Sequence, residues 1–122
     1  MAAFVYLICW TQDGALTKYG MTGDPRNRKE WERWARAKYR DELRIWGNWS
    51  RAYAVPMTTP REAKDWEILM GKIANLRDLK RKHPWRHKEN GKDGEWCVSG
   101  DETIDCFNAA LQQFTDQRKL FP

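Results

Sequence analysis

The chain has 122 residues, of which 41% are hydrophobic and 32% are charged, and this composition excludes an intrinsically disordered protein. Its length predicts one domain over residues 1–122 with a single core, and its net charge of +5 is concentrated in one segment. The apolar stretch 4–10 is far shorter than the ~20 residues of a membrane span, and it lacks the basic start of a signal peptide. With three widely spaced cysteines that suit free thiols, we therefore expect a cytoplasmic protein that does not contact a membrane.

The first element along the chain is a predicted β-hairpin within residues 4–21, where β-branched, aromatic and aliphatic residues flank a glycine-containing turn. We expect a three-residue loop, Gln12-Asp13-Gly14, with its glycine in the left-handed conformation. This loop pairs Ile8 with Lys18 and brings Tyr6 and Lys18 to one face of the sheet. A two-residue loop would place them on opposite faces.

A basic helix and a third strand are predicted next. Asp24-Pro25 offers an N-cap followed by a proline at the first helical position, which predicts a helix over residues 24–38. Alternating apolar residues over 43–55 predict a strand that is interrupted by a bulge near Gly47-Asn48 and ended by Pro56.

The second predicted helix has a strong start, because Thr59-Pro60-Arg61-Glu62 forms a capping box. Trp66, Met70 and Leu76 belong to its predicted buried stripe. Glu67 lies at the rim of that stripe, where its carboxylate can reach solvent.

A strongly basic segment over residues 77–92 follows, with seven Lys and Arg against two acids, so it accounts for the whole charge excess. Such a segment is typical of phosphate binding, although a solvated loop has the same composition. A short strand near residues 95–99 and an amphipathic helix over 102–118 complete the chain. The predicted fold is α/β (α+β): a small, mostly antiparallel three-stranded sheet with an N-terminal hairpin, flanked by helices.

The order and spacing of several motifs resemble those of the GIY-YIG nuclease domain over roughly residues 4–100. The residues that carry the resemblance are Val5-Tyr6-Leu7, Lys18-Tyr19-Gly20-Met21-Thr22, Arg28, Glu67 within a helix, and Gly94-Glu95-Trp96-Cys97. The similarity is greatest to the phage and bacterial branch with lysine in the second motif. Phe4 replaces the glycine that opens the first motif, and the late asparagine of the family has no clear counterpart, with Glu95, Trp96 and Asn90 nearest in order.

The resemblance implies a metal-dependent endonuclease that hydrolyses phosphodiester bonds in DNA or RNA, with DNA as the leading substrate. It implies Tyr6 as general base, Lys18 in the place of the second-motif tyrosine, Arg28 as the phosphate and transition-state stabiliser, and Glu67 as the ligand of a single Mg²⁺ or Mn²⁺. A carboxylate suits a cation that keeps waters and phosphate oxygens, and the arginine fork suits a phosphoryl group. The ordinary tyrosine pKa of about 10 is too high for a base at neutral pH, so Lys18 or the metal must lower the pKa of Tyr6. Lys18 has direct contact with phosphate as its alternative role.

Backbone contacts with nucleic acid are expected from exposed basic side chains, which favour sequence-independent binding. These candidates are Arg26, Lys29, Arg33, Lys80, Arg81, Lys82, Arg86 and Lys88. Trp85 either stacks on a base or packs its loop down. With no recognition domain in the sequence, specificity would be weak, or would come from a homodimer or an accessory protein.

Three other interpretations remain open. The first is a catalytically inactive module of the same fold that binds nucleic acid or protein. The second is a regulatory protein that binds a partner through exposed tryptophans such as Trp46, Trp49 or Trp85. The third and weakest is a zinc site made from His83, His87, Cys97 and Cys106, since Pro84 separates the histidines and the cysteines form no tight knuckle.

Overall fold

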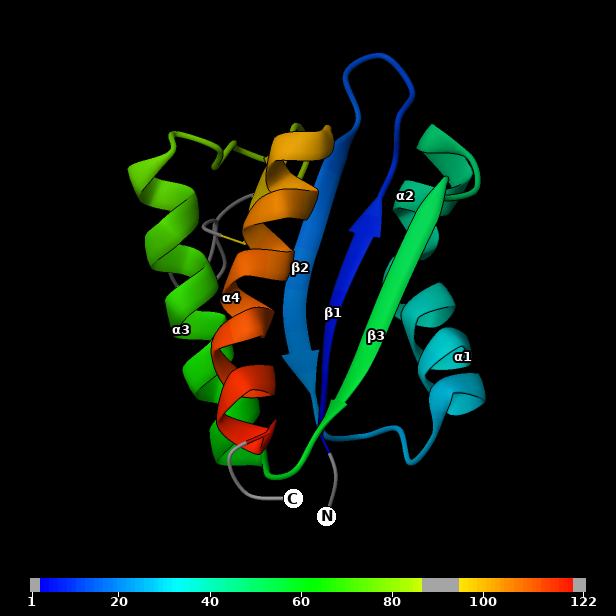
Figure 1. Cartoon of the computed structure of the whole chain (residues 1–122). Coiled ribbons are helices and arrows are strands. Elements are labelled where there is room, and N and C mark those ends of the chain that lie inside the picture. Colours follow the sequence, from blue (N-terminus) through cyan, green and yellow to red (C-terminus); the bar gives the residue numbers. More distant parts are fainter. Residues whose placement is uncertain (1–2, 87–94, 120–122) are drawn as a thin grey trace.

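The protein forms a four-stranded antiparallel sheet with helices on both faces (Figure 1). The computed structural model describes residues 3–86 and 95–119. The elements are β1 (Ala3–Cys9), β2 (Leu16–Thr22), α1 (Arg28–Lys38), α2 (Arg40–Trp46), β3 (Arg51–Met57), α3 (Pro60–Leu76), β4 (Trp96–Val98) and α4 (Asp101–Lys119). The α+β class is confirmed, but the sheet has four strands in the order β3-β1-β2-β4 instead of three, because the short β4 pairs with β2.

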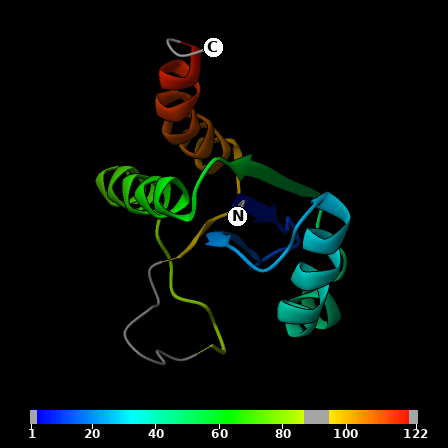
Figure 2. The same ribbon diagram turned by 90° about the horizontal axis from the view of Figure 1, so that it is seen from below.

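Strand β1 lies in the interior of the sheet and is buried on both faces. Val5 and Leu7 point to the core beneath α3 and α4, whereas Tyr6 and Ile8 point to the core beneath α1 and α2. Figure 2 shows these two pairs of helices on opposite sides of the sheet. A strand with apolar or aromatic residues at nearly every position fits this two-sided burial.

The predicted hairpin register is confirmed. Ile8 lies opposite Lys18, and Tyr6 lies opposite Gly20. Gly14 has φ +78°, and the amide of Ala15 donates to the carbonyl of Gln12 at 2.9 Å, which closes the three-residue loop.

The predicted start of the first helix is wrong. Helix α1 begins at Arg28, and its N-cap is Asn27, whose side chain accepts from the amide of Glu30 at 2.9 Å. The Asp24-Pro25 pair lies in the preceding turn. Asp24 and Asn27 are both possible N-caps. Asn27 is the one used, because the helix that it starts buries Trp31 and Ala35 against the sheet.

The predicted strand over residues 43–55 is also wrong in its first half. Residues 40–46 form α2, and only Arg51–Met57 form β3. Glu42 and Trp46 are buried on one face of α2, where they contact the segment around His83 and Arg86. This distant contact decides the local structure, and Gly47 with φ +82° ends the helix.

The second helix, α3, has the predicted cap. The side chain of Thr59 accepts from the amide of Glu62, and Glu62 Oε1 accepts from the amide of Thr58 at 3.3 Å. Trp66 and Met70 are buried as expected, whereas Leu76 is 87% exposed at the last position of the helix.

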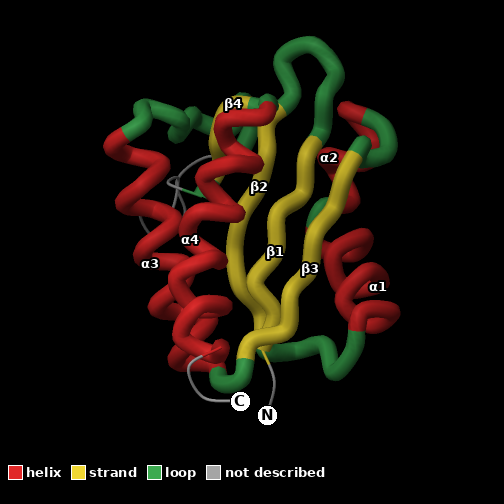
Figure 3. The backbone as a smooth tube through the Cα atoms, in the orientation of Figure 1, coloured by secondary structure: helices red, strands yellow, loops and turns green. Residues whose placement is uncertain are grey.

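The two edges of the sheet differ in a way that positions the candidate site. Strand β3 forms one edge and carries Pro56, which has no N–H to donate. Strand β4 forms the other edge but pairs only with Leu16–Lys18 of β2 (Figure 3). The amide of Tyr19 donates to the carbonyl of Glu95 at 3.2 Å, and β4 does not extend along the rest of β2.

None of the helices in the described part of the chain has the length and apolar composition that a membrane span requires.

Candidate active site at the β2 edge

Tyr6 is buried beneath α1 and bonded to a second tyrosine. Its side chain is 2% exposed, and its hydroxyl lies 2.5 Å from the hydroxyl of Tyr39, the residue that ends α1. A side chain at Gly20 would clash with this phenol, because a Cβ there would lie 2.7 Å from the Tyr6 oxygen. Gly20 therefore makes room for Tyr6 across the hairpin, which is a packing reason for the glycine.

Burial raises the pKa of Tyr6 strongly, and the carboxylates of Glu95 and Glu67 raise it further. The hydrogen bond with Tyr39 acts in the opposite direction but is the smaller effect. Tyr6 is therefore a neutral phenol at physiological pH in this state of the protein. This is the opposite of the lowered pKa expected of a general base.

Lys18 lies in the same layer as Tyr6 and is 6% exposed. Its ammonium forms a very short ion pair with Glu95 and lies 5.5 Å from the centre of the Trp96 ring. Burial lowers the pKa of Lys18, against the opposing effect of the Glu95 and Glu67 carboxylates. Glu95 thus compensates the charge of Lys18, which was expected to lower the pKa of Tyr6 or to contact phosphate.

Glu67 approaches from the opposite side of the sheet. Helix α3 packs on the face opposite to Tyr6, so the expectation that hairpin and helix point into one common pocket is wrong in its simple form. The Glu67 side chain is 15% exposed at the flank of α3, and Lys64 donates to its Oε1 at 2.9 Å. Its charge still acts on Tyr6 and Lys18, and it raises the pKa of each.

Lys80 lies at the same edge. Its Nζ would be 3.5 Å from a Cβ at Gly71, and the hydroxyl of Tyr19 would be 3.3 Å from that Cβ. Gly71 is one helical turn beyond Glu67, so the ammonium of Lys80 and the carboxylate of Glu67 belong to neighbouring turns on one side of α3. The backbone of Lys80 is held by a β-bridge with Cys97.

Arg28 does not join this group. Its Nη2 donates to the carbonyl of Ala52 at 3.1 Å, and its guanidinium lies 5.0 Å from the centre of the Trp31 ring. Ala52 belongs to β3, at the edge of the sheet opposite to β4. The structure therefore places Tyr6 and Lys18 on one face of the sheet, Glu67 on the opposite face and Arg28 at the far edge.

The basic side chains predicted to contact nucleic acid differ in their exposure and in whether they already form ion pairs. Arg26, Lys29, Arg33, Arg81 and Lys82 are exposed, Lys80 is half-buried, and Lys88 lies outside the described residues. Arg26 is paired with Glu30 at 3.5 Å, within one turn of the chain.

Arg86 has a structural role, and its contact with nucleic acid stays a prediction. It grips the buried carboxylate of Glu42 with two nitrogens, one of them at 2.8 Å, and donates to the carbonyl of Lys38 at 3.3 Å. Glu42 is completely buried, and His83 Nε2 lies 3.0 Å from its Oε2. We call Glu42, His83 and Arg86 the Glu42 cluster, which joins α2 to the segment that precedes β4.

Packing accounts for the tryptophans of this region. The Trp85 ring centre lies 4.9 Å from that of Trp46 and 4.3 Å from that of His83, so Trp85 packs its loop down. Trp46 is 7% exposed and Trp49 is half-buried, which gives no exposed tryptophan patch of the kind that the regulatory alternative requires.

The described residues offer a cation separate carboxylates and no enclosing set of ligands. The described residues contain no group of three His, Cys, Asp or Glu side chains able to surround an ion, and His87, one of the four residues of the zinc alternative, lies outside them. Glu67 and Glu95 offer carboxylate oxygens, and Mg²⁺ commonly binds one or two carboxylates while waters and phosphate oxygens complete its shell. Lys64 contacts only Oε1 of Glu67.

Sequence reasoning missed Tyr39 and the Glu42 cluster. Tyr39 follows Trp31 and Ala35 at intervals of four residues, a helical spacing that would have placed it on the buried face. Glu42 is four residues before Trp46, but its buried partners are more than forty residues away in the chain.

We call Tyr6, Lys18, Tyr39, Glu67 and Glu95 the β2-edge cluster.

Comparison with known protein families, with curated proteins and with solved structures gives no match.

Proposed function

We propose that the protein is a metal-dependent endonuclease that hydrolyses phosphodiester bonds in DNA, and that the β2-edge cluster is its active site. One observation carries the proposal: a nearly buried lysine that is ion-paired with Glu95 lies on the same face of the sheet as a bonded tyrosine pair, and the charge of Glu67 acts on both Lys18 and Tyr6. Ionisable groups with strongly shifted pKa values gather at functional sites more often than elsewhere. The cytoplasmic location and the DNA partner are part of the same proposal.

Glu67, Glu95 and Lys80 each have a task in this proposal. Glu67 would hold the cation, and Glu95 fixes Lys18 by their ion pair. Lys80, beside the turn of α3 that follows Glu67, takes the role of phosphate contact for which Arg28 is too distant. A divalent cation bound at Glu67 would neutralise charge on the phosphate and remove the small contribution of Glu67 to the raised pKa of Tyr6, whose main cause is burial.

Tyr6 has two conceivable tasks in the reaction, and its surroundings rank them. As a neutral phenol bonded to Tyr39, it is ready to donate or share a hydrogen bond. To act as a base on water it must first lose its proton, which burial and the two carboxylates oppose. Because burial is the largest of these effects, the hydrogen-bonding role of the neutral phenol ranks first and proton abstraction from water ranks second.

The proposal predicts that Glu67→Gln lowers Mg²⁺- or Mn²⁺-dependent nicking of supercoiled plasmid by at least about 10²-fold, because the cation loses its carboxylate. DNA retention in a gel-shift assay should persist, and EDTA should abolish nicking by the wild type. Asp65→Asn is the matched control, since Asp65 is an exposed carboxylate on the same helix. Wild-type nicking by Glu67→Gln would remove Glu67 from the active site.

A second candidate function is sequence-independent binding of nucleic acid without catalysis. It is favoured by the sealed, neutral Tyr6 and by the position of Arg28 at the β3 edge. In that case the plasmid assay should show no metal-dependent nicking by the wild type, while retention of DNA falls steeply as salt is raised.

A further inference from the structure

His83 is a buried histidine between α3 and β4, and its two ring nitrogens have different surroundings. Nδ1 accepts hydrogen bonds from the backbone amides of Trp85 at 3.3 Å and of Arg86 at 3.1 Å. Nε2 lies 3.0 Å from Oε2 of the buried Glu42 carboxylate. A ring nitrogen that accepts hydrogen bonds carries no proton, so this geometry requires the neutral imidazole with its proton on Nε2.

The packing around His83 opposes a positive charge on its ring. The side chain is 6% exposed. The ring centres of Trp46, Trp85 and Trp96 lie 5.2, 4.3 and 4.5 Å from its own. Burial is the largest effect on the imidazole and lowers the pKa of His83 below the ordinary value of 6.5.

Three charged side chains act on this imidazole from the elements around it, while β4 presents the uncharged ring of Trp96. Glu42 of α2 raises the pKa of His83, whereas Arg86 and Lys18 of β2 lower it. Both oxygens of the Glu42 carboxylate already bind the guanidinium of Arg86, which limits its attraction for a second cation. A further proton on the ring can go only to Nδ1, where it would meet two amide N–H groups.

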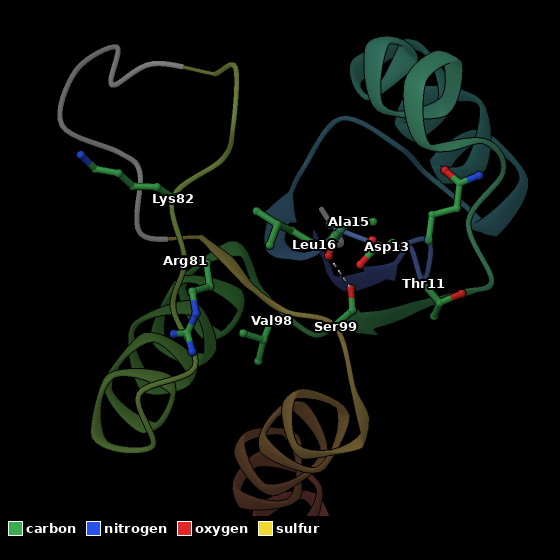
Figure 4. A pocket seen from close by; sticks show the side chains of 10 residues that line it. Thr11, Asp13, Ala15, Leu16, Arg81, Lys82, Val98 and Ser99 are labelled. Atoms are coloured by element: carbon green, nitrogen blue, oxygen red, sulfur yellow. Dashed lines mark hydrogen bonds between the residues drawn. The ribbon is translucent and has the colours of Figure 1, made fainter.

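The segment that carries His83 is attached to the rest of the protein at two places. Its first part is paired with β4, where the amide of Arg81 donates to the carbonyl of Trp96 at 2.8 Å. Its second part, residues 83–86, is attached to α2 through the Glu42 cluster. The side chains of Arg81 and Lys82 point away from each other and take no part in that cluster (Figure 4). Loss of the second attachment would therefore leave the first in place.

These contacts form an acid-sensitive device. We propose that His83 is a latch: protonation of Nδ1 breaks its two amide hydrogen bonds and releases residues 83–86 from α2, which uncovers Glu42 and Trp46. Above about pH 6.5 the ring is neutral whether the latch is closed or open, and the closed state has its full stability. As the pH falls toward the lowered pKa of His83, the open state binds the proton first, so the latch opens. The inference does not depend on the proposed nuclease activity.

Amide hydrogen exchange between pH 7.5 and pH 5.5, corrected for the intrinsic exchange rate, measures this opening directly. We expect the opening constant at the Arg86 amide to rise about three- to tenfold between pH 6.5 and pH 5.5, because opening takes up at most one proton. The amide of Arg81, which is bonded to Trp96, should keep its protection. This difference separates local opening from global unfolding.

His83→Asn is the decisive variant, because its Oδ1 can accept the same amide hydrogen bonds but takes up no proton. The opening constant at its Arg86 amide should be the same at pH 6.5 and pH 5.5. His87→Gln is the matched control, since His87 is the other histidine of the chain, and it should behave like the wild type.

An NMR titration of the wild type keeps the test independent of whether His83→Asn folds. The His83 ring should carry its proton on Nε2 at pH 7.5, and the amide signals of Trp85 and Arg86 should shift with the same midpoint as the ring. The inference is overturned by a proton on Nδ1 at pH 7.5, by equal loss of protection at Arg81 and Arg86, or by a pH dependence that persists in His83→Asn. Disappearance of the dependence in His87→Gln would overturn it as well.

Discussion

At the scale of single residues, the central feature is a lysine that has been taken out of water and given one carboxylate partner. Lys18 is 6% exposed, and Glu95 binds it from the loop just before β4. Burying an ammonium costs several kcal/mol unless a partner compensates its charge, so the position of Glu95 is tied to that of Lys18. The pair therefore fixes the charges beside Tyr6, and the carboxylate of Glu67 raises the pKa of both Tyr6 and Lys18 from the opposite face of the sheet.

The nuclease proposal assigns the phosphate contact to Lys80 and not to Arg28. We expect Lys80→Gln to lower plasmid nicking by about 10²-fold, the loss typical of a single transition-state donor. Arg28→Gln should stay within about threefold of the wild type, because its guanidinium is bonded to Ala52 at the β3 edge. Initial nicking rates at saturating metal measure both. The reverse order of effects would return the phosphate role to Arg28, and Lys80→Arg should retain most of the activity.

At the scale of elements, the Glu42 cluster holds α2 and the segment that leads to β4 together. Glu42 is completely buried and bonded to Arg86, while Nδ1 of His83 accepts from the backbone amides of Trp85 and Arg86 at 3.3 and 3.1 Å. The same segment carries Lys80, Arg81 and Lys82 along the edge of β4. The cluster therefore positions basic side chains that it does not itself include.

Arg86→Ala should accordingly act on stability and not on DNA contacts. Without Arg86 the buried charge of Glu42 loses its main partner, so we expect the free energy of unfolding in urea to fall by about 3–5 kcal/mol. Where the variant is folded, the slope of log affinity for DNA against log salt should match the wild type. Lys82→Ala is the paired control, with normal stability and a slope reduced by about one. A reduced slope in Arg86→Ala would restore its predicted role at the phosphate backbone.

At the scale of the whole molecule, three buried phenols give the protein a distinct response to alkali. Burial raises the pKa of Tyr6, Tyr19 and Tyr39 above the ordinary value of 10. Below pH 10 these groups are protonated in both the folded and the unfolded chain, and their contribution to stability is complete. As the pH rises further, the unfolded chain loses these protons first, so stability falls.

The prediction is a marked drop in the free energy of unfolding between pH 10 and pH 11, measured by urea denaturation. Lys18 has the opposite sign: because its folded pKa is lowered, its contribution makes stability rise with pH until the unfolded lysine titrates near 10.5, and above that pH the contribution is constant. Tyr39→Phe should be less stable at pH 8, where Tyr6 loses its partner, and should show a shallower drop at high pH. Constant stability from pH 8 to pH 11 would contradict the burial of these tyrosines.

Local sequence patterns predicted the structure correctly where all the interacting residues lie within one short stretch of the chain. The hairpin register followed from the turn at Gly14, and the start of α3 followed from the Thr59 capping box. The predictions were wrong where contacts with residues distant in the chain determine the local secondary structure. Residues 43–46 alternate like a strand but form a helix, since Glu42 and Trp46 are buried against His83 and Arg86.

The sequence by itself determined the α+β class, the hairpin that aligns Tyr6 with Lys18, the capped helix that carries Glu67, and the location of the basic excess. Only the tertiary structure decided that Lys18 is bound by Glu95, that Tyr6 is bonded to Tyr39, and that Arg28 lies at the opposite edge from Glu67. The physical reason is that periodicity and capping act over a few residues. The partner of a buried charge or phenol is chosen by strand order and helix placement, which join residues as far apart as Lys18 and Glu95.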